Sequence, residues 1–387
     1  MCRNHFLYRL IKPLTLVCVL ISSHVTLGCQ TVLAQSTSTS LPFLSIEPDA
    51  RASALGGSGV TMTEEGFGAY YNPASLGWKK KSSVGLSYSN WLAGLGTAYQ
   101  YNRFAATKAF KQSALAVSVT YMNLGKQTAT DASNNVIGTF TNYQAASGIS
   151  YGRRMTKRLS FGLGLKHIYS SLGAGQSLEG RSIDPAWTYA GDVGLLWHTS
   201  TFKLLGRDGT IRFGSSLSHF GPGISYLNEG NRSALPQTFR VGLGMTRNLG
   251  KSGDQRLSLS ADALHILARS EPKLVGNDTV WASVSPLDAL MKGWGSVERL
   301  QGDQWIQLSL MEQLGFAFGG EYQFKEVFAL RGGYFMDDPN NGNRQFVTVG
   351  AGFKVYTFQI DFSYLHSMEA YHPMDGTMRM SLLLNFK

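Results

Sequence analysis

From residue 82 to the C-terminus, hydrophobic residues alternate with small or polar residues in stretches of about ten. The stretches 113–123, 236–247 and 357–366 show the alternation most clearly. A period of two places the two residue types on opposite faces of a β-strand. Ten residues is also about the length of a tilted strand that crosses a membrane. The pattern therefore predicts strands with one apolar face and one polar face.

The number of these strands and the lengths of their connections indicate a closed sheet. Connections on one side are short, as at 153–158 and 325–326, whereas those on the other side are longer and include 267–307. Bacterial outer-membrane barrels have an even number of strands, short periplasmic turns and long outer loops. The penultimate residue, Phe386, supplies the aromatic end common in such barrels. Fourteen stretches fit: 82–91, 95–105, 113–123, 141–152, 159–170, 187–198, 210–220, 236–247, 256–266, 308–324, 327–336, 344–355, 357–366 and 377–387.

The composition of the polar face indicates what it meets. Gly, Ser and Ala dominate this face, whereas the water-facing side of a soluble sheet is usually rich in Lys, Glu and Thr. A small-residue face suits a crowded lumen, and the apolar face suits lipid. We therefore expect an all-β fold, a transmembrane antiparallel β-barrel of about 14 strands; a secreted β-sandwich is the alternative. The few charges on the polar face are Lys166, Asp192, Arg212, Arg240, Asp262, Glu321, Arg331, Lys354, Asp361 and Arg379.

Residues 35–80 do not follow the alternation, and we expect them to form a plug, or hatch, inside the barrel. This segment is rich in glycine and contains the turn Asn72-Pro73-Ala74. Irregular backbone is tolerated at membrane depth only inside protein or beside water. A periplasmic tail is the alternative. Because an unpaired buried charge is very unfavourable, charges of the plug and lumen should meet, and the candidate contacts are Glu47, Asp49, Arg51, Arg240, Arg331 and Asp361.

The first 34 residues have the pattern of a cleaved export signal, with three basic residues before a short apolar run at 14–21. Cleavage after Ala34 is expected, and lipoprotein processing at Cys29 is the alternative. All three cysteines lie in this segment, so cleavage at Ala34 leaves no disulfide, thiol nucleophile or Cys-bound metal. The predicted organisation is a signal at 1–34, a plug at 35–80 and a barrel at 81–387 whose long outer loop is 267–307.

Composition further narrows the class of protein. Only 16% of the 387 residues are charged, and after the signal no run of about 20 apolar residues follows, which excludes a helical membrane bundle. Loss of the signal lowers the formal net charge from +10 to +7. An exported basic chain is expected to contact an anionic envelope surface, and nucleic acid is not an expected partner.

Several segments share the pattern of one known family. They are PFLSIEPDARA at 42–52, LGGSGV at 55–60, LPQTFR at 235–240, FALRGGYF at 328–335, RQFVTVGAGFK at 344–354 and HPMDGTMRMSL at 372–382. Through them the chain resembles the PorV/PorQ family of FadL-like outer-membrane proteins. The turn Asn72-Pro73-Ala74 departs from the Asn-Pro-Ala-Lys form of this family, and the loop 267–307 is the least similar part.

The resemblance implies a fourteen-stranded barrel with an N-terminal hatch in the cell outer membrane. It also implies a role in type IX secretion: binding the C-terminal domains of secreted cargo proteins and shuttling them from the translocon barrel to a sortase-like attachment complex. Outer-membrane lipid is a further expected partner. A FadL-like uptake channel for hydrophobic small molecules is the alternative function.

Catalytic chemistry is not expected. The six histidines of the mature chain lie near predicted strand ends or in loops, and no closely spaced His/Glu set suggests a metal site. Direct deacylation of lipid A is a third possibility that the resemblance raises, but no convincing catalytic set supports it. No cofactor is predicted; a bound lipid or lipopolysaccharide is the ligand class left open.

The long loop 267–307 is the candidate surface for cargo or another partner. Exposed aromatic side chains are unfavourable unless they pack or meet a partner. The alternative is that they fold onto the barrel mouth or lie in the membrane interface. The candidate residues are Trp281, Trp294, Trp305, Leu287 and Met291.

Overall fold

The computed structural model describes residues 39–386, except for short gaps at 64–65, 96–98, 131–132, 134, 179–180, 205, 227–231, 251–252, 276–277 and 302–303. The predicted signal, residues 1–34, lies outside the described residues.

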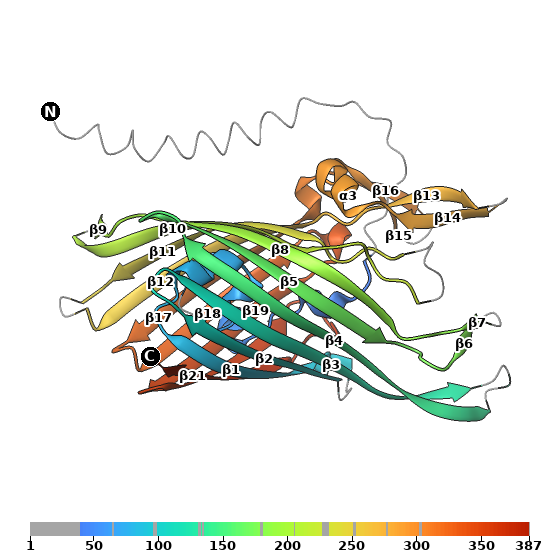
Figure 1. The fold of residues 1–387 in the computed structure, drawn as a ribbon, viewed down its shortest axis with the longest axis horizontal. Helices are drawn as coiled ribbons and strands as arrows, with labels where there is room; N and C mark the ends of the chain where they lie inside the picture. The colour runs from blue at the N-terminus through green and yellow to red at the C-terminus, as the bar shows by residue number, and fades with distance from the viewer. Residues whose placement is uncertain are drawn as a thin grey trace. The chain divides into compact units, whose positions relative to one another are not determined.

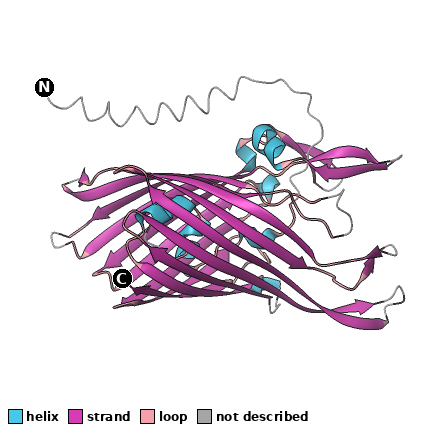
Figure 2. Cartoon of the chain, in the orientation of Figure 1, coloured by secondary structure: helices cyan, strands magenta, loops and turns pink. Residues whose placement is uncertain are grey.

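In the described part of the chain, fourteen antiparallel strands form one closed ring (Figures 1 and 2). Each strand pairs with the next along the chain, and the last pairs with the first, with Phe386 opposite Ser82. This ring confirms the predicted barrel of fourteen strands. Its members are β1 (Ser82–Trp91), β2 (Tyr99–Ala109), β3 (Ser113–Thr130), β4 (Val136–Arg154), β5 (Leu159–Ser171), β8 (Ala186–His198), β10 (Arg207–Phe220), β11 (Thr238–Asn248), β12 (Gln255–Ile266), β17 (Leu314–Phe324), β18 (Phe328–Asp337), β19 (Gln345–Val355), β20 (Phe358–Ser367) and β21 (Met378–Phe386).

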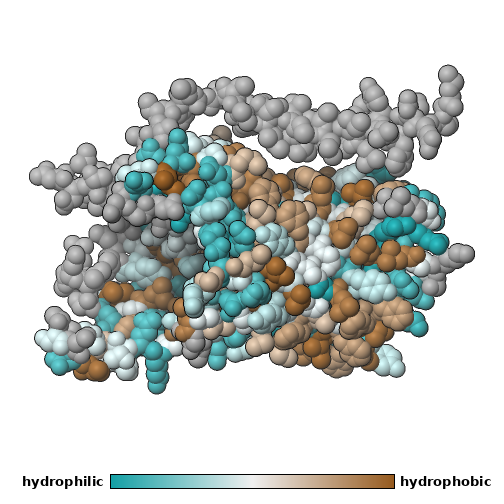
Figure 3. Space-filling model, turned by 180° about the vertical axis from the view of Figure 1, so that it is seen from behind, coloured by the Kyte–Doolittle hydropathy of each residue, from teal (hydrophilic) through white to brown (hydrophobic). Residues whose placement is uncertain are grey.

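The apolar residues of the alternation point outward. On β5, Leu163 and Leu165 are 53% and 68% exposed, and on β20 the outward residues are also large and apolar, whereas Asp361 is buried. Apolar side chains gather on the outer surface of the barrel in the space-filling view (Figure 3). Exposed hydrophobic residues on the wall and polar residues inside are the reverse of a soluble sheet and match a wall that faces lipid.

Several predicted strand boundaries are wrong, and the strand predicted at 95–105 is β2 at Tyr99–Ala109. The stretch predicted as one strand at 308–324 contains the end of β16 (Gln304–Leu308), the 3₁₀ turn η5 (Met311–Gln313) and then β17. A short apolar segment gives the same pattern in a loop hairpin and in a barrel strand, so the alternation alone does not separate the end of β16 from β17. The strands β3 and β4 also extend well beyond 113–123 and 141–152, because their pairing continues past the bulge near Asn123 to Thr130.

The connections lie at two distinct ends of the barrel. At the short-turn end, tight connections join β2 to β3, β4 to β5 and β17 to β18, and β9 (Phe202–Leu204) pairs with the start of β10. At the long-loop end lie the longer connections, with η4 (Ala93–Leu95), β6 (Ser177–Leu178), β7 (Arg181–Ser182) and η6 (Pro339–Asn341). The helices that the structure describes include none that is long and apolar enough to span a membrane.

The longest connection folds as a unit of its own at the long-loop end. We call residues 267–313 the loop unit. It contains two hairpins, β13 (Ser270–Val275) with β14 (Asp278–Ser283) and β15 (Val297–Gln301) with β16, together with the helix α3 (Pro286–Lys292) and η5. Buried Leu267, Val297 and Leu308 form its interior.

The segment of residues 41–79, called the plug from here on, lies inside the barrel (Figure 1). It contains η1 (Pro42–Ser45), α2 (Ala50–Ala54), η2 (Gly68–Tyr70) and η3 (Pro73–Trp78). Glycines of the wall make room for it. A Cβ atom added at Gly162 would lie 2.2 Å from the carbonyl carbon of Pro73, and one at Gly333 would lie 2.1 Å from the amide nitrogen of Gly56. The small-residue face of the alternation therefore receives the plug.

Candidate functional site

The plug takes its local shape from helix-end signals in its sequence. Asp49 begins α2, and its carboxylate accepts a hydrogen bond of 3.0 Å from the amide of Ala52. Gly56 follows α2 with a φ of +68°, a conformation that glycine adopts without strain. Asn72 begins η3 in the same way as Asp49, with Pro73 at the first helical position. These ends place the helices of the plug against the barrel wall.

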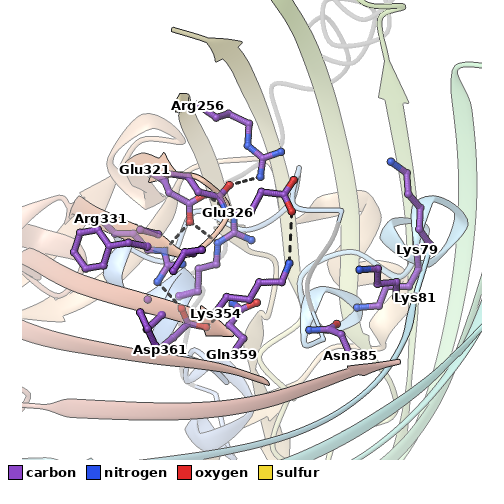
Figure 4. Close-up of a pocket in the computed structure, with 18 residues that line it drawn as sticks. Lys79, Lys81, Arg256, Glu321, Glu326, Arg331, Lys354, Gln359, Asp361 and Asn385 are labelled. Carbon is purple, nitrogen blue, oxygen red and sulfur yellow. Dashed lines mark hydrogen bonds and ion pairs between the residues drawn. The ribbon is translucent and has the colours of Figure 1, made fainter. Parts of the chain in front are cut away.

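A chain of buried ion pairs joins the plug to the wall. Arg51 of α2 donates to both carboxylate oxygens of Glu321 on β17, at 2.6 and 2.7 Å. Arg331 of β18 donates to the same carboxylate at 2.7 Å and to Asp361 of β20 at 2.7 Å (Figure 4). Glu321 therefore bridges one plug cation and one wall cation. Paired in this way, the charges escape the large penalty of isolated burial.

Other wall charges hold the plug at separate points. Asp262 of β12 accepts hydrogen bonds from the amides of Gly59 and Val60 at 2.7 and 3.0 Å. Arg240 of β11 donates to the carbonyl of Gly57 at 2.7 Å. Arg379 of β21 donates to Glu47 at 3.1 Å and to the hydroxyl of Ser53 at 2.6 Å. Residues of the barrel wall thus bind both charged side chains and backbone groups of the plug.

Of the six candidate plug-lumen contacts, the structure brings five into this network. Arg51 reaches Glu321, Arg331 joins Glu321 to Asp361, Arg240 reaches the plug backbone, and Glu47 meets Arg379. Asp49 is buried and caps α2 rather than forming one of these ion pairs.

Glu321, Asp262 and Arg379 are among the charges predicted on the polar face, but they are not among the six named plug contacts. A signal for all three exists in the sequence, because each is a charged residue at an inward position of its strand. The alternation identifies that position, but it does not say which plug atom lies opposite.

A second buried cluster lies on the side of the lumen formed by β5, β8 and β10. Lys166 lies 2.8 Å from the carboxylate of Asp192 and 3.0 Å from a ring nitrogen of His219. The amide of His219 donates to the same Asp192 at 2.9 Å, beside a bulge in the pairing of β10 with β8. This cluster holds the irregular end of β10 in place, and His219 takes part in it through Asp192 and Lys166.

A cavity of about 930 Å³ opens above the plug at the long-loop end. Its lining mixes apolar residues of the wall, such as Phe335, Phe346 and Leu365, with Ile46 of the plug and Trp305 of the loop unit. The volume is in the range of ligand sites for small organic molecules. Ile46, Glu47 and Gly57 of the plug are part of the lining, so the cavity lies against the plug.

The predicted aromatic residues of the loop unit have different surroundings in the structure. Trp294 packs edge to face on Phe239 of β11, with ring centroids 5.2 Å apart, and lies 5.4 Å from the ring of His265. Its indole nitrogen donates to the carbonyl of Leu290. Trp305 lies on β16 and is 51% exposed. The side chain of Trp281, on β14, lies outside the described residues.

The helix α3 presents the two predicted aliphatic residues outward. Ser285 caps the helix, accepting a hydrogen bond of 3.1 Å from the amide of Asp288. Leu287 and Met291, four residues apart, share one face and are 62% and 66% exposed, whereas Ala289 is buried. The result is an exposed apolar face on α3, whereas the half-exposed Trp305 lines the mouth cavity.

Arg269 holds the loop unit together. It is 1% exposed and donates to the carbonyls of Ala268 and Gly293 and to the side-chain oxygen of Gln313. Burial lowers the pKa of Arg269 to about 10, so the guanidinium stays charged at neutral pH. Its hydrogen bonds go to neutral acceptors drawn from both ends of the unit.

We expect Arg269→Met to loosen the loop unit by roughly 1–3 kcal/mol, because buried carbonyl and amide acceptors then lose their donor. Limited proteolysis and hydrogen exchange of residues 267–313 would measure this effect. The matched control is Lys292→Met, which removes an exposed ion pair with Asp288 of 3.6 Å and should change little. Equal protease sensitivity of the two variants would contradict the role of Arg269.

No group of three or more His, Cys, Asp or Glu side chains that could hold a metal ion occurs among the residues that the structure describes. Asp262 and His265 lie three residues apart on β12 but have different surroundings. Asp262 faces the plug, whereas His265 contacts Trp294 and the carbonyl of Gly293 in the loop unit.

A sequence profile described as Type IX secretion system protein PorV matches residues 30–270, which is more than half of the chain. The chain belongs to the PorV family. This agrees with the resemblance seen in the sequence and makes the protein an outer-membrane component of type IX secretion. A comparison with curated proteins gives no match for this PorV-family chain.

Solved structures with a similar fold are outer-membrane channels. The toluene transporter TbuX of Ralstonia pickettii is 12% identical, with a TM-score of 0.49 over 88% of this chain and 98% of the other. The toluene transporter TodX of P. putida is 11% identical, with a TM-score of 0.48 over 87% and 98%. A Pseudomonas aeruginosa FadL homologue is 12% identical, with a TM-score of 0.46 over 88% and 98%.

Proposed function

We propose that this PorV-family protein binds the C-terminal domains of secreted cargo at the long-loop end and passes them from the translocon barrel to a sortase-like attachment complex. The apolar surface of the loop unit carries this proposal. Exposed Leu287 and Met291 lie on one helix face, and Trp305 is half exposed. In a barrel of this kind the long loops face the cell exterior, where apolar groups in water favour a protein partner.

The contacts that hold the plug in the lumen also favour a surface role over conduction. The plug is bound by ion pairs from β17 and β21 and by hydrogen bonds from β11 and β12. A conducting route would have to break several of these contacts at once. A shuttle needs no open lumen, because the cargo stays on the outer surface.

The test of this function is surface display of cargo in cells that carry a triple variant, Leu287→Ser with Met291→Ser and Trp305→Ser. We expect display to fall about tenfold or more, because truncation of central apolar contacts typically costs 2 kcal/mol or more. Trp294 is left in place because it packs within the protein.

The matched control is Val136→Ser with Ile137→Ser, which removes similarly exposed apolar residues from the β3–β4 hairpin at the same end. Both proteins must still run as heat-modifiable barrels. Normal display by the triple variant, or an equal loss in the control, would count against the loop unit as the cargo surface.

An uptake channel for hydrophobic small molecules is the second candidate, and the mouth cavity of about 930 Å³ favours it. Its apolar residues, among them Phe335 and Phe346, suit a hydrocarbon or fatty acid. Purification of the protein from its native outer membrane separates the two functions. Co-purified proteins that share one C-terminal domain support the shuttle, and bound fatty acid or hydrocarbon supports uptake.

A further inference from the structure

The short-turn end contains a pocket with a strong excess of positive charge. Its volume is about 260 Å³, and it lies below the plug between the inner faces of β17 to β21 (Figure 4). Among the residues that the structure describes, three carboxylates line it: Glu321, Glu326 and Asp361. The seven cationic residues of the lining are Arg51, Lys79, Lys80, Lys81, Arg256, Arg331 and Lys354.

The two deeper carboxylates are already bound by arginines. Glu321 is held by Arg51 and Arg331, and Asp361 accepts from Arg331 at 2.7 Å and from Gln359 at 2.7 Å. The third, Glu326, is 75% exposed at the rim and lies 4.0 Å from Lys354. The acids of the pocket therefore neutralise its inner wall, and Lys81, Arg256 and Lys354 are cationic groups nearer the opening.

The cationic groups face the pocket from two sides. Lys354 and Arg256 extend from the wall strands β19 and β12. On the other side, the buried Lys79 ends the plug and the exposed Lys81 lies between the plug and β1 (Figure 4). Arg256 also donates to Gln323, which fixes its position at the edge. An anion that enters the opening thus meets positive charge on opposite sides.

The turns around this opening extend the same charge. They add Lys111, Lys157, Arg158, Lys203 and Lys325, with Asp208 and Asp254 as the acidic residues among the described positions nearby. A single small anion would use only part of such a field. A chain segment with several carboxylates could fill the pocket and also pair with the rim, and complementary fields of this extent speed association.

We propose that the short-turn pocket binds an acidic peptide segment of a periplasmic protein. The short turns of an outer-membrane barrel face the periplasm, so such a protein has access to this end. Arg51 and Lys79 of the plug line the pocket, so the segment docks against the plug. This interaction lies at the opposite end from the proposed cargo surface and does not depend on it.

The experiment measures the binding of fluorescein-labelled hexaglutamate to the purified full-length protein in an uncharged detergent. We expect binding that weakens steeply with salt and no binding of hexaglutamine. The pocket variant combines Lys81→Gln, Arg256→Gln and Lys354→Gln, and it should lower the affinity about tenfold or more. The matched variant Lys111→Gln, Lys157→Gln, Lys203→Gln loses the same charge outside the pocket and should lower it less than about threefold.

Three results would overturn the proposal. An equal loss of affinity in the two variants would mean diffuse attraction to the rim. Inorganic phosphate displacing the peptide as effectively as unlabelled hexaglutamate would mean a site for small anions. Vesicles of phosphatidylglycerol that bind more weakly to the pocket variant, while hexaglutamate binding is unchanged, would mean a lipid site. Because the assay uses no cargo, its outcome is separate from that of the display experiment.

Discussion

Glu321→Gln is expected to lower the free energy of unfolding by about 3–5 kcal/mol, because removal of one partner from a buried ion pair leaves the others uncompensated. Glu321 is buried and receives hydrogen bonds from both Arg51 and Arg331. After the substitution Arg331 keeps its bond to Asp361, whereas Arg51 loses the carboxylate that accepted from it twice. The heat-modifiable shift of the folded barrel on gels, followed against temperature and denaturant, measures the loss. Faster protease cleavage within residues 41–79 should accompany it.

An exposed ion pair provides the control for this prediction. Lys203 and Asp208 lie 2.7 Å apart at the short-turn end, and both side chains are about half exposed or more. Solvent screens such a pair, so Asp208→Asn should cost no more than about 1 kcal/mol. If both variants unfold at the wild-type midpoint, the bridge through Glu321 does not hold the plug.

Gly333→Val is expected to displace the plug and open the lumen. A Cβ atom at Gly333 would lie 2.1 Å from the amide nitrogen of Gly56 and 2.3 Å from the carbonyl carbon of Leu55. Both are backbone atoms of the plug, so no side chain can rotate away. Overpacking of this kind costs about 1–3 kcal/mol or more. Ion conductance in planar bilayers measures the opening, and we expect it to rise above that of the wild type.

The next residue back along β18 gives a close control. Gly332 faces outward, and the nearest atom to an added Cβ there is a carbonyl oxygen at 4.0 Å. Gly332→Val therefore adds an apolar side chain to the lipid face and should leave conductance unchanged. Raised conductance in both variants would point to a damaged wall rather than a displaced plug.

The barrel is predictable from the sequence because strands of a membrane-spanning wall follow a simple alternating pattern. Each strand has one side in lipid, so its residues alternate, as Leu163 and Leu165 do with Gly162 and Gly164. The long-loop unit was harder to predict. Its strands β13 to β16 are short hairpins outside the membrane, where the constraint of a lipid-facing side is lost. This is why the predicted stretch 308–324 runs from the end of β16 through η5 into β17.

The sequence predicts which charged residues take part in contacts between the plug and the lumen, but not which of them pair. Burial requires that Arg51, Arg240 and Arg331 meet polar partners, and their positions in the chain predict that requirement. The choice of partner depends on where the plug sits within the lumen. Asp49 illustrates the limit, because its carboxylate caps its own helix instead of forming one of the network's ion pairs. The roles of Trp294 and Trp305 likewise depend on how the loop unit folds over β11 and β12.

The sequence by itself thus determined the class of the fold, the strand number and the family, because alternation and family motifs are properties of neighbouring positions along the chain. Tertiary structure alone decided that Glu321 bridges plug and wall, that Arg269 ties the loop unit together and that seven cationic residues converge on one pocket. Each of these arrangements joins residues far apart in sequence. Ionic and hydrogen-bonded contacts form at distances near 3 Å, and only the closed barrel brings such distant groups that close.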